Sequence, residues 1–148
     1  MVGRRILSPP DVERILQRMA LEILERHYGY ALPFIIPASP MGNQLAEKLK
    51  TYLQAEGAPP LPDSAPPSEI TCLLLVDDVL HTGRTLLRQI VSALTRYPEA
   101  SIETLVLIDR GHRHYPICAD YVGIRLATTL QEYVRVRIGA EGWEVWLE

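Results

Sequence analysis

Two neighbouring acids, Asp77 and Asp78, follow an apolar run and precede a short loop that contains glycine and hydroxyl side chains. Adjacent carboxylates repel each other and lose hydration in an apolar setting, so they are tolerated where a cation or ligand hydroxyls reach them. Ribose supplies vicinal hydroxyls, and Mg²⁺ is a hard cation that binds carboxylates, phosphates and water. The pair therefore indicates a site for a sugar, for a ligand-borne metal ion, or for both.

The loop after the acids has the features of a phosphate site. Residues 81–85 present successive backbone N–H groups, and Gly83 lets a ligand approach the backbone closely. Thr82 and Thr85 add hydroxyl donors, and the helix that follows adds the positive end of its dipole. Arg84 either adds charge or is a solvated residue at the helix start. Acids for a sugar and amides for its phosphate predict a ribose-5-phosphate site, with ordinary turn chemistry as the alternative.

An alternation of strands and helices must position these residues. Helical periodicity is expected over residues 11–28, 44–53 and 84–97, and buried strands over 32–36, 70–76, 102–108 and 121–124. Two alternating runs, 134–138 and 143–147, predict a closing β-hairpin. This order favours an α/β fold with a mainly parallel sheet flanked by helices. Ligands of such sheets bind beyond the carboxyl ends of the strands, where the acidic pair and its loop stand.

Single residues predict local details of these elements. Asp11 is expected to cap the first helix, His27 to end it, and Pro40 and Gly42 to mark a loop before the second helix. In the third helix, the apolar spacing predicts four side chains that face the core: Leu87, Ile90, Val91 and Leu94.

A segment rich in proline precedes the strand that leads to the acids. Residues 57–68 contain five prolines, which exclude a central strand or a helix interior. We expect a surface connection within one domain that spans residues 1–148.

Length and composition are typical of one globular domain. The 148 residues are 47% hydrophobic and 22% charged, and the net charge of −3 gives no general attraction for nucleic acid. No apolar run approaches the ~20 residues that span a bilayer, and no signal peptide is recognised, so we expect a cytoplasmic protein without a membrane partner. Cys72 and Cys118 lack metal-ligand spacing, which favours incidental thiols over a disulfide or a ligand role.

The run from Val76 to Thr85 resembles the phosphoribosyl pyrophosphate (PRPP) motif of type I phosphoribosyltransferases. Further segments are similar to the pyrimidine operon attenuation regulators, a family of uracil phosphoribosyltransferases: 18–26, 106–113, 116–117 and 119–123. The Asp-Arg-Gly-His-Arg run at 109–113 is fairly specific to that family. The resemblance covers most of the chain except its middle, and it implies a type I phosphoribosyltransferase fold and a homodimer.

By this resemblance, the reaction would convert uracil and PRPP to UMP and pyrophosphate with the help of Mg²⁺. Asp77 and Asp78 would hold the ribose hydroxyls, and residues 82–85 would hold the 5-phosphate of PRPP or of a nucleoside monophosphate. Tyr121 and Val122 would lie beside the base, with the backbone of Val122 reading its polar edge.

The same comparison shows two departures. The loop that binds pyrophosphate in the family usually carries basic residues, whereas residues 37–42 contain no cation. Ser39, Met41 and Gly42 stand in this degenerate loop, and only Gly42 matches well. The family also carries a strand and a flexible hairpin where this chain has its proline-rich connection. The departures predict that ligand binding is retained better than catalysis, which is weakened or lost.

Two further roles stay open. His81 stands where some purine-specific relatives carry a proposed general base, so it is either a catalytic residue or a solvent-facing loop residue. Arg18, His112 and Arg113 match the basic face with which the family binds an mRNA leader, or else they form surface pairs or support a dimer. Three hypotheses follow: a pyrimidine-salvage phosphoribosyltransferase, a weakened nucleotide or PRPP sensor, and a non-catalytic RNA-binding regulator of pyrimidine gene expression.

Overall fold

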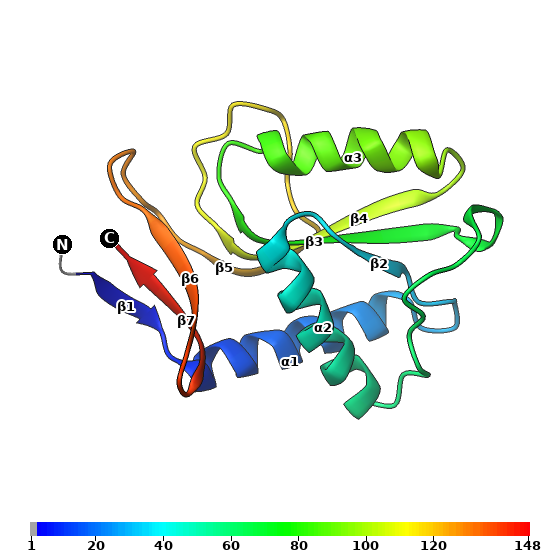
Figure 1. Cartoon of the computed structure of the whole chain (residues 1–148), viewed down its shortest axis with the longest axis horizontal. Helices are drawn as coiled ribbons and strands as arrows, with labels where there is room; N and C mark the ends of the chain where they lie inside the picture. Colours follow the sequence, from blue (N-terminus) through cyan, green and yellow to red (C-terminus); the bar gives the residue numbers. More distant parts are fainter. Residues whose placement is uncertain (1–2) are drawn as a thin grey trace.

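Four parallel strands form the central sheet of the protein, whose computed structural model describes residues 3–148 (Figure 1). The strands lie in the order β2-β3-β4-β5 and run over Phe34–Pro37, Cys72–Leu80, Ser101–Asp109 and Tyr121–Arg125. Because all four are parallel, their carboxyl ends share one edge of the sheet and their amino ends the other.

Helices cover both faces of this sheet (Figure 1). α1 (Pro9–Arg26) and α2 (Pro40–Ala55) lie on one face, and α3 (Arg84–Arg96) lies on the other. The larger core cluster is buried between α1, α2 and the sheet, and its fully buried side chains include Leu16, Met19, Leu45, Leu49 and Leu105. Burial of each such side chain stabilises the fold by roughly 1.5–3 kcal/mol. A single 3₁₀ turn, η1 (Pro67–Glu69), precedes β3.

The two ends of the chain build a second, antiparallel sheet in the order β1-β7-β6. The predicted hairpin is present as β6 (Val134–Gly139) and β7 (Gly142–Leu147), and β1 (Arg4–Leu7) pairs with β7. The sequence pattern does not predict β1, because its pairing partner lies at the other end of the chain. The predicted α/β fold, with a mainly parallel sheet flanked by helices and a C-terminal hairpin, is confirmed.

Three predicted boundaries are wrong. The apolar run predicts a strand that ends at Val76, but β3 continues through both acids to Leu80, because pairing with β4 satisfies its backbone groups. α2 begins at Pro40, since Ser39 caps it and proline suits the first helical position. Ser8 rather than Asp11 is the N-cap of α1, and the Asp11 carboxylate completes a capping box with it.

α3 also presents to the sheet a different face from the one that its apolar spacing predicts. Leu86 and Ala93 are buried, whereas Val91 is 56% and Leu94 is 48% exposed. The other two predicted positions are only half-buried. Apolar residues occupy more than one side of this helix, so periodicity alone does not determine which side packs on the sheet.

The proline-rich segment lies beside the edge strand β2. Residues 58–66 form neither helix nor strand. Residues 61–65 and β2 together line two cavities of about 200 and 220 Å³. Proline cannot donate to a strand ladder, so this cover does not extend the sheet. None of the helices between residues 3 and 148 is long and apolar enough to cross a membrane.

Candidate functional site

Asp77 lies in β3 near the carboxyl edge of the central sheet and is 5% exposed. Its Oδ1 accepts hydrogen bonds from Ser39 Oγ at 2.7 Å and from the backbone N–H of Asp78 at 2.9 Å. Burial raises the pKa of this carboxyl to about 7, and a side-chain hydrogen bond with Asp78 adds to the increase, whereas the Ser39 bond opposes it. Asp77 is therefore a buried carboxyl whose ionised form the protein stabilises only in part.

Neither acid has a cationic partner within the described residues 3–148. The ion pairs found there all involve other carboxylates, such as Asp109 with Arg113 and Glu103 with Arg26. Two close carboxylates without a cation repel each other, and a bound cation or ligand hydroxyls would relieve that repulsion. A ligand can therefore supply the cation that the acidic pair lacks within the described residues, or further hydroxyl donors.

Ser39 connects the acidic pair to the start of α2. Its Oγ accepts a hydrogen bond from the backbone N–H of Gly42 at 2.9 Å while it donates to Asp77. A Cβ on Gly42 would lie 2.3 Å from the Val76 carbonyl oxygen, so only glycine fits here. Met41, between them, packs its side chain against the core. These three residues of the predicted pyrophosphate loop therefore form the first turn of a helix and its cap.

Residues 81–85 connect β3 to α3. Gly83 is the N-cap of α3 in the left-handed conformation, with φ of 92°. A Cβ there would also approach Ile117 Cβ to 3.3 Å, so two independent reasons select glycine. Thr82 Oγ1 accepts a hydrogen bond from the backbone N–H of Arg84 at 3.3 Å. The predicted turn and helix start are present as expected.

A small hollow lies within this turn. Residues 79–86 and Asp77 line a cavity of about 80 Å³. The first N–H groups of a helix have no acceptor within the helix, and they carry partial positive charge. The Thr85 hydroxyl lies in the first turn of α3, and the exposed Arg84 side chain donates from Nε to the Tyr115 hydroxyl at 3.3 Å. The hollow combines small size with N–H donors, which suits a compact anion such as a phosphate group.

The segment after β4 is bound tightly to this turn. The Thr82 carbonyl oxygen accepts a hydrogen bond from the His114 N–H at 2.9 Å. Arg113 donates from Nη1 to the His81 carbonyl oxygen at 2.8 Å and pairs through Nη2 with Asp109 Oδ1 at 2.6 Å. Arg113 therefore connects the end of β4 to the turn after β3.

Arg110 is only 8% exposed, yet its guanidinium contacts neutral acceptors alone. It donates to Thr128 Oγ1 at 3.2 Å, to the Glu132 carbonyl oxygen at 2.5 Å and to His81 Nδ1 at 3.4 Å. Because arginine has no acceptor, His81 Nδ1 must accept, and the imidazole proton is on Nε2. Burial, followed by the charge of Arg110, lowers the pKa of His81. His81 is therefore suited to donate a hydrogen bond rather than to act as a general base.

An open cavity of about 550 Å³ adjoins this turn at the carboxyl ends of β4 and β5. Its lining residues are Asp109, Arg110, Gly111, Arg113, Ile117, Arg125, Leu126 and Ala127. Three arginines against one aspartate make the lining positive, and the volume is that of ordinary small-molecule sites. The residue types did not predict this lining, but the rule that ligands bind beyond strand carboxyl ends could have indicated it.

Known proteins resemble this chain in sequence and in fold. The phosphoribosyl transferase domain family matches residues 68–134. The bifunctional protein PyrR of Deinococcus radiodurans is 34% identical over 158 aligned positions, which cover 90% of this chain and 86% of that protein. The bifunctional protein PyrR of Bacillus subtilis is 33% identical, with 90% of this chain and 88% of that protein covered. The chain belongs to the PyrR family of phosphoribosyltransferases.

The fold of this PyrR-family chain is also that of solved phosphoribosyltransferases. The HGPRT-ase of Leishmania tarentolae, solved in complex with GMP, matches with a TM-score of 0.73 over 86% of this chain and 83% of that one. The sequence identity is 21%, so this likeness concerns the fold alone. The predicted resemblance to type I phosphoribosyltransferases is confirmed.

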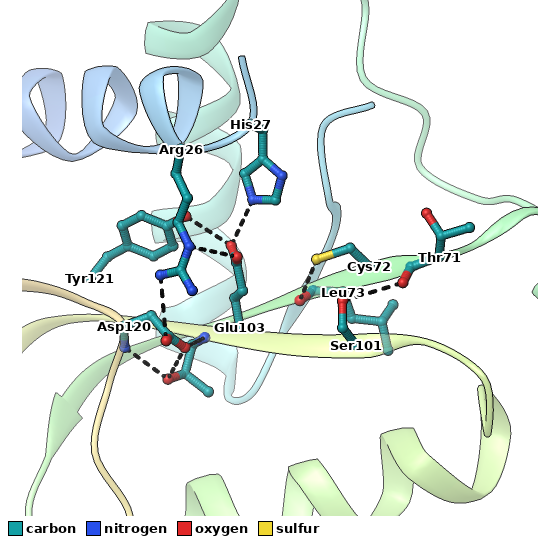
Figure 2. Close-up of polar contacts among 10 residues, drawn as sticks. Arg26, His27, Thr71, Cys72, Leu73, Ser101, Glu103, Asp120 and Tyr121 are labelled. Atoms are coloured by element: carbon teal, nitrogen blue, oxygen red, sulfur yellow. Dashed lines mark hydrogen bonds and ion pairs between the residues drawn. The ribbon is translucent and has the colours of Figure 1, made fainter. Parts of the chain in front are cut away.

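The two residues that the PyrR resemblance assigns to the base lie at the start of β5, away from the lining of the large cavity. The Tyr121 ring is buried in the core, and its hydroxyl donates to Glu103 Oε1 at 2.8 Å (Figure 2). Val122 is half-buried and packs in the cluster on the α3 side. The carboxyl end of β5 is Arg125, so the later residues of the strand and the loop beyond it face the cavity.

The residues assigned to RNA by the PyrR resemblance have internal partners. Arg18 pairs with Glu22 at 2.5 Å and donates to the Val122 carbonyl oxygen at 3.3 Å. His112 has a φ of 55°, and its Nε2 contacts the Thr128 carbonyl oxygen. Together with the internal contacts of Arg113, these bonds hold all three side chains in place. The structure does not bring Arg18 together with the other two: Arg18 contacts β5, whereas Arg113 contacts His81 and His112 contacts Thr128.

Proposed function

We propose that this protein binds PRPP or a nucleoside 5′-monophosphate at the carboxyl edge of the central sheet, with a pyrimidine as its base. In this proposal Asp77 and Asp78 bind the ribose hydroxyls, and residues 82–85 bind the 5-phosphate through backbone N–H groups and hydroxyls. The reaction type is that of a uracil phosphoribosyltransferase, and its turnover is weak or lost.

One observation carries the proposal. Asp77 is buried without a cationic partner among residues 3–148, and it lines the same hollow as the first turn of α3. Carboxylates that accept from hydroxyls beside N–H groups that donate to an anion match the two halves of a ribose phosphate. A purely structural acid at this depth would be expected to pair with a cation.

The donor set of the acidic pair also fits Mg²⁺. The available ligands are carboxylate oxygens, and Mg²⁺ is usually bound through one or two carboxylates together with substrate phosphates and water. Asp77 and Asp78 would hold the ion that accompanies PRPP, and the ion would neutralise charge on the departing pyrophosphate.

The large cavity at the ends of β4 and β5 is where we place the base. It adjoins the turn through Arg113 and Arg110, which both contact His81. Neutral His81 can donate from Nε2 to a ligand oxygen, and the buried Arg110 fixes that tautomer. Type I sites of this kind work mainly by positioning the reactants, so these contacts would orient the base toward the sugar.

Two features support weak turnover. The segment where relatives bind pyrophosphate has no cation, and its Ser39 hydroxyl already donates to Asp77. The alignment with the Deinococcus radiodurans relative spans 158 positions but includes only 90% of these 148 residues, about 133, so that relative has about 25 residues without a counterpart here. A closing lid excludes water from such reactions, and residues 58–66 supply no strand pair for one.

Two measurements on the full chain test the proposal. Calorimetry with PRPP and Mg²⁺, and separately with UMP, is expected to show saturable binding to one site. Conversion of radiolabelled uracil to UMP is expected to be far below the ordinary enzyme median of ~10 s⁻¹. Absence of binding by both ligands would refute the site, and turnover near that median would refute the loss of catalysis while leaving the site intact.

RNA binding stays a prediction for which the contacts offer no added support. A gel shift with the host's pyrimidine leader RNA at two salt concentrations checks it, since phosphate contacts weaken as salt rises. Retention of the shift in an Arg18→Gln variant would remove Arg18 from the interface.

A further inference from the structure

At the opposite, amino edge of the central sheet, three side chains with metal-binding chemistry converge (Figure 2). His27 is the C-cap residue of α1, Cys72 is the first residue of β3, and Glu103 lies near the start of β4. A ring nitrogen of His27, the Sγ of Cys72 and a carboxylate oxygen of Glu103 all lie within 4.8 Å of one another. This cluster is separate from the acidic pair and the turn at the carboxyl edge.

We propose that His27, Cys72 and Glu103 form a binding site for a divalent transition metal of the zinc class. Imidazole nitrogen, thiolate sulfur and carboxylate oxygen are the three ligand types that zinc uses in proteins. A thiolate is too soft a ligand for Mg²⁺ or Ca²⁺, so the donor set separates this site from the oxygen site at Asp77 and Asp78.

The spacing requires only small adjustments. Zinc–ligand bonds of about 2.0–2.3 Å in a tetrahedron place the ligand atoms roughly 3.3–3.6 Å apart. His27 Nε2 and Glu103 Oε1 are now hydrogen-bonded at 2.8 Å, so they must separate slightly to admit the ion. The Cys72 sulfur must approach by about 1.2 Å at most, a distance within reach of a side-chain rotation.

The surroundings of Glu103 orient its carboxylate for this role. Tyr121 donates its hydroxyl hydrogen to Oε1 at 2.8 Å, and Arg26 Nε lies 3.0 Å from Oε2 (Figure 2). Hydrogen bonds of this kind to a ligating carboxylate are the usual outer shell of a metal site. The charge of Arg26 opposes a bound cation, but its Nη1 also pairs with Asp120 Oδ1 at 3.5 Å, and the thiolate and carboxylate together neutralise a divalent ion.

The cluster is shielded from bulk water but open on one side. The side chains of His27 and Glu103 are only 12% and 10% exposed. Cys72 lines the cavity of about 220 Å³ between the segment that leads into β2 and the proline-rich residues 61–65. That cavity supplies an entry path and room for the water or fourth ligand that three protein ligands leave to complete a tetrahedron.

Metal binding at this point would connect three elements that meet only in the folded chain. The end of α1, the first residue of β3 and the early part of β4 would share one ion. Since such a site is absent from the unfolded chain, binding raises the free energy of unfolding when metal is present.

Cobalt(II) tests the proposal, because it occupies zinc sites and reports its ligands by absorption. Titration of the full metal-free chain with Co²⁺ is expected to give a thiolate-to-cobalt charge-transfer band in the near ultraviolet and tetrahedral bands in the visible range. Zinc should displace the cobalt, and millimolar Mg²⁺ should not. Cys72→Ser is expected to abolish the charge-transfer band and weaken binding by at least about 100-fold, since even outer-shell changes lower affinity 10–100-fold.

The second cysteine provides a matched control. Cys118 is exposed and is not one of the three clustered ligands, so Cys118→Ser should keep the full spectrum. His27→Gln should weaken cobalt binding as well, and thermal unfolding in chelator verifies that each variant is folded. The proposal is overturned if the folded wild type gives no charge-transfer band, or if the band survives in Cys72→Ser.

Discussion

The amino and carboxyl edges of the central sheet differ in whether their buried charged side chains have oppositely charged partners. At the amino edge, the Glu103 carboxylate receives hydrogen bonds from His27 and Tyr121 and pairs with Arg26 at 3.0 Å (Figure 2). At the carboxyl edge, Asp77 has only a hydroxyl and a backbone N–H as donors, and Arg110 is buried among neutral acceptors.

The charge of Glu103 has an oppositely charged partner within the protein, whereas the charges of Asp77 and Arg110 have none among the described residues. An unpaired buried charge costs several kcal/mol, so a fold keeps one where something outside the chain supplies its partner. Both uncompensated charges lie where strands of a parallel sheet end, at the edge where such sheets bind ligands. The compensated cluster joins α1 to the sheet, and in our proposal it accepts a metal without leaving a charge unpaired.

The largest effect is expected on PRPP affinity, when both acids of the carboxyl edge are replaced. Asp77→Asn combined with Asp78→Asn should lower the affinity for PRPP by at least about 100-fold, because two charge-assisted hydrogen-bond groups of about 1.5–3 kcal/mol each are lost. Calorimetry in the presence of Mg²⁺ measures this effect. Asp63→Asn is the matched control, since the Asp63 side chain is 90% exposed. Unchanged affinity in the double variant would eliminate the proposed site.

The next largest effect is expected from a substitution of Glu103 at the amino edge. Glu103→Ala should lower the free energy of unfolding by about 3 kcal/mol, because Arg26, His27 and Tyr121 all lose their shared acceptor. Urea unfolding in chelator measures it, with the exposed Glu99→Ala as control. PRPP affinity of the folded variant should not change. A parallel loss of PRPP binding would mean that the two edges are not independent.

The third effect concerns pH. The folded pKa of Asp77, about 7, lies above its unfolded value of 3.8, so the protonated form is favoured by folding. Its contribution to stability is complete below pH 3.8 and is lost as the pH rises toward 7. Relative to wild type, Asp77→Asn should therefore gain about 3 kcal/mol of stability between pH 4 and pH 8. The urea midpoints of both proteins across that pH range measure this gain. A stability difference that does not change with pH would contradict the claim that burial without a cationic partner raises the pKa of Asp77.

The smallest effect concerns the residue that connects Asp77 to α2. Ser39→Ala removes the N-cap of α2 and one donor to Asp77, which should destabilise the fold by about 1 kcal/mol. Ser39→Thr retains a capping hydroxyl and should recover most of that loss. Thermal unfolding measures both variants, and equal stability of Ser39→Ala and wild type would show that the hydroxyl does not cap α2 in solution.

The sequence predicted those parts of the fold that depend on neighbouring residues. The strand-turn-helix around Gly83 and the C-terminal hairpin depend on local apolar patterns and on turn residues, so both were predicted correctly. The length of β3 and the buried face of α3 depend on pairing with β4 and on packing against the sheet, and there the predictions were wrong. Similarly, β1 depends on a strand more than a hundred residues away.

The sequence by itself determined that two acids and a glycine turn stand together, because residues 77–85 are contiguous and their backbone sets their geometry. Only the tertiary structure decided the pKa of Asp77, since the burial that raises this pKa comes from elements far along the chain. The tertiary structure also decided that His27, Cys72 and Glu103 meet, because only the parallel pairing of β3 with β4 and the end of α1 bring them within 4.8 Å. The spacing of cysteines along a chain contains no information about such a meeting, because its ligands come from three separate elements.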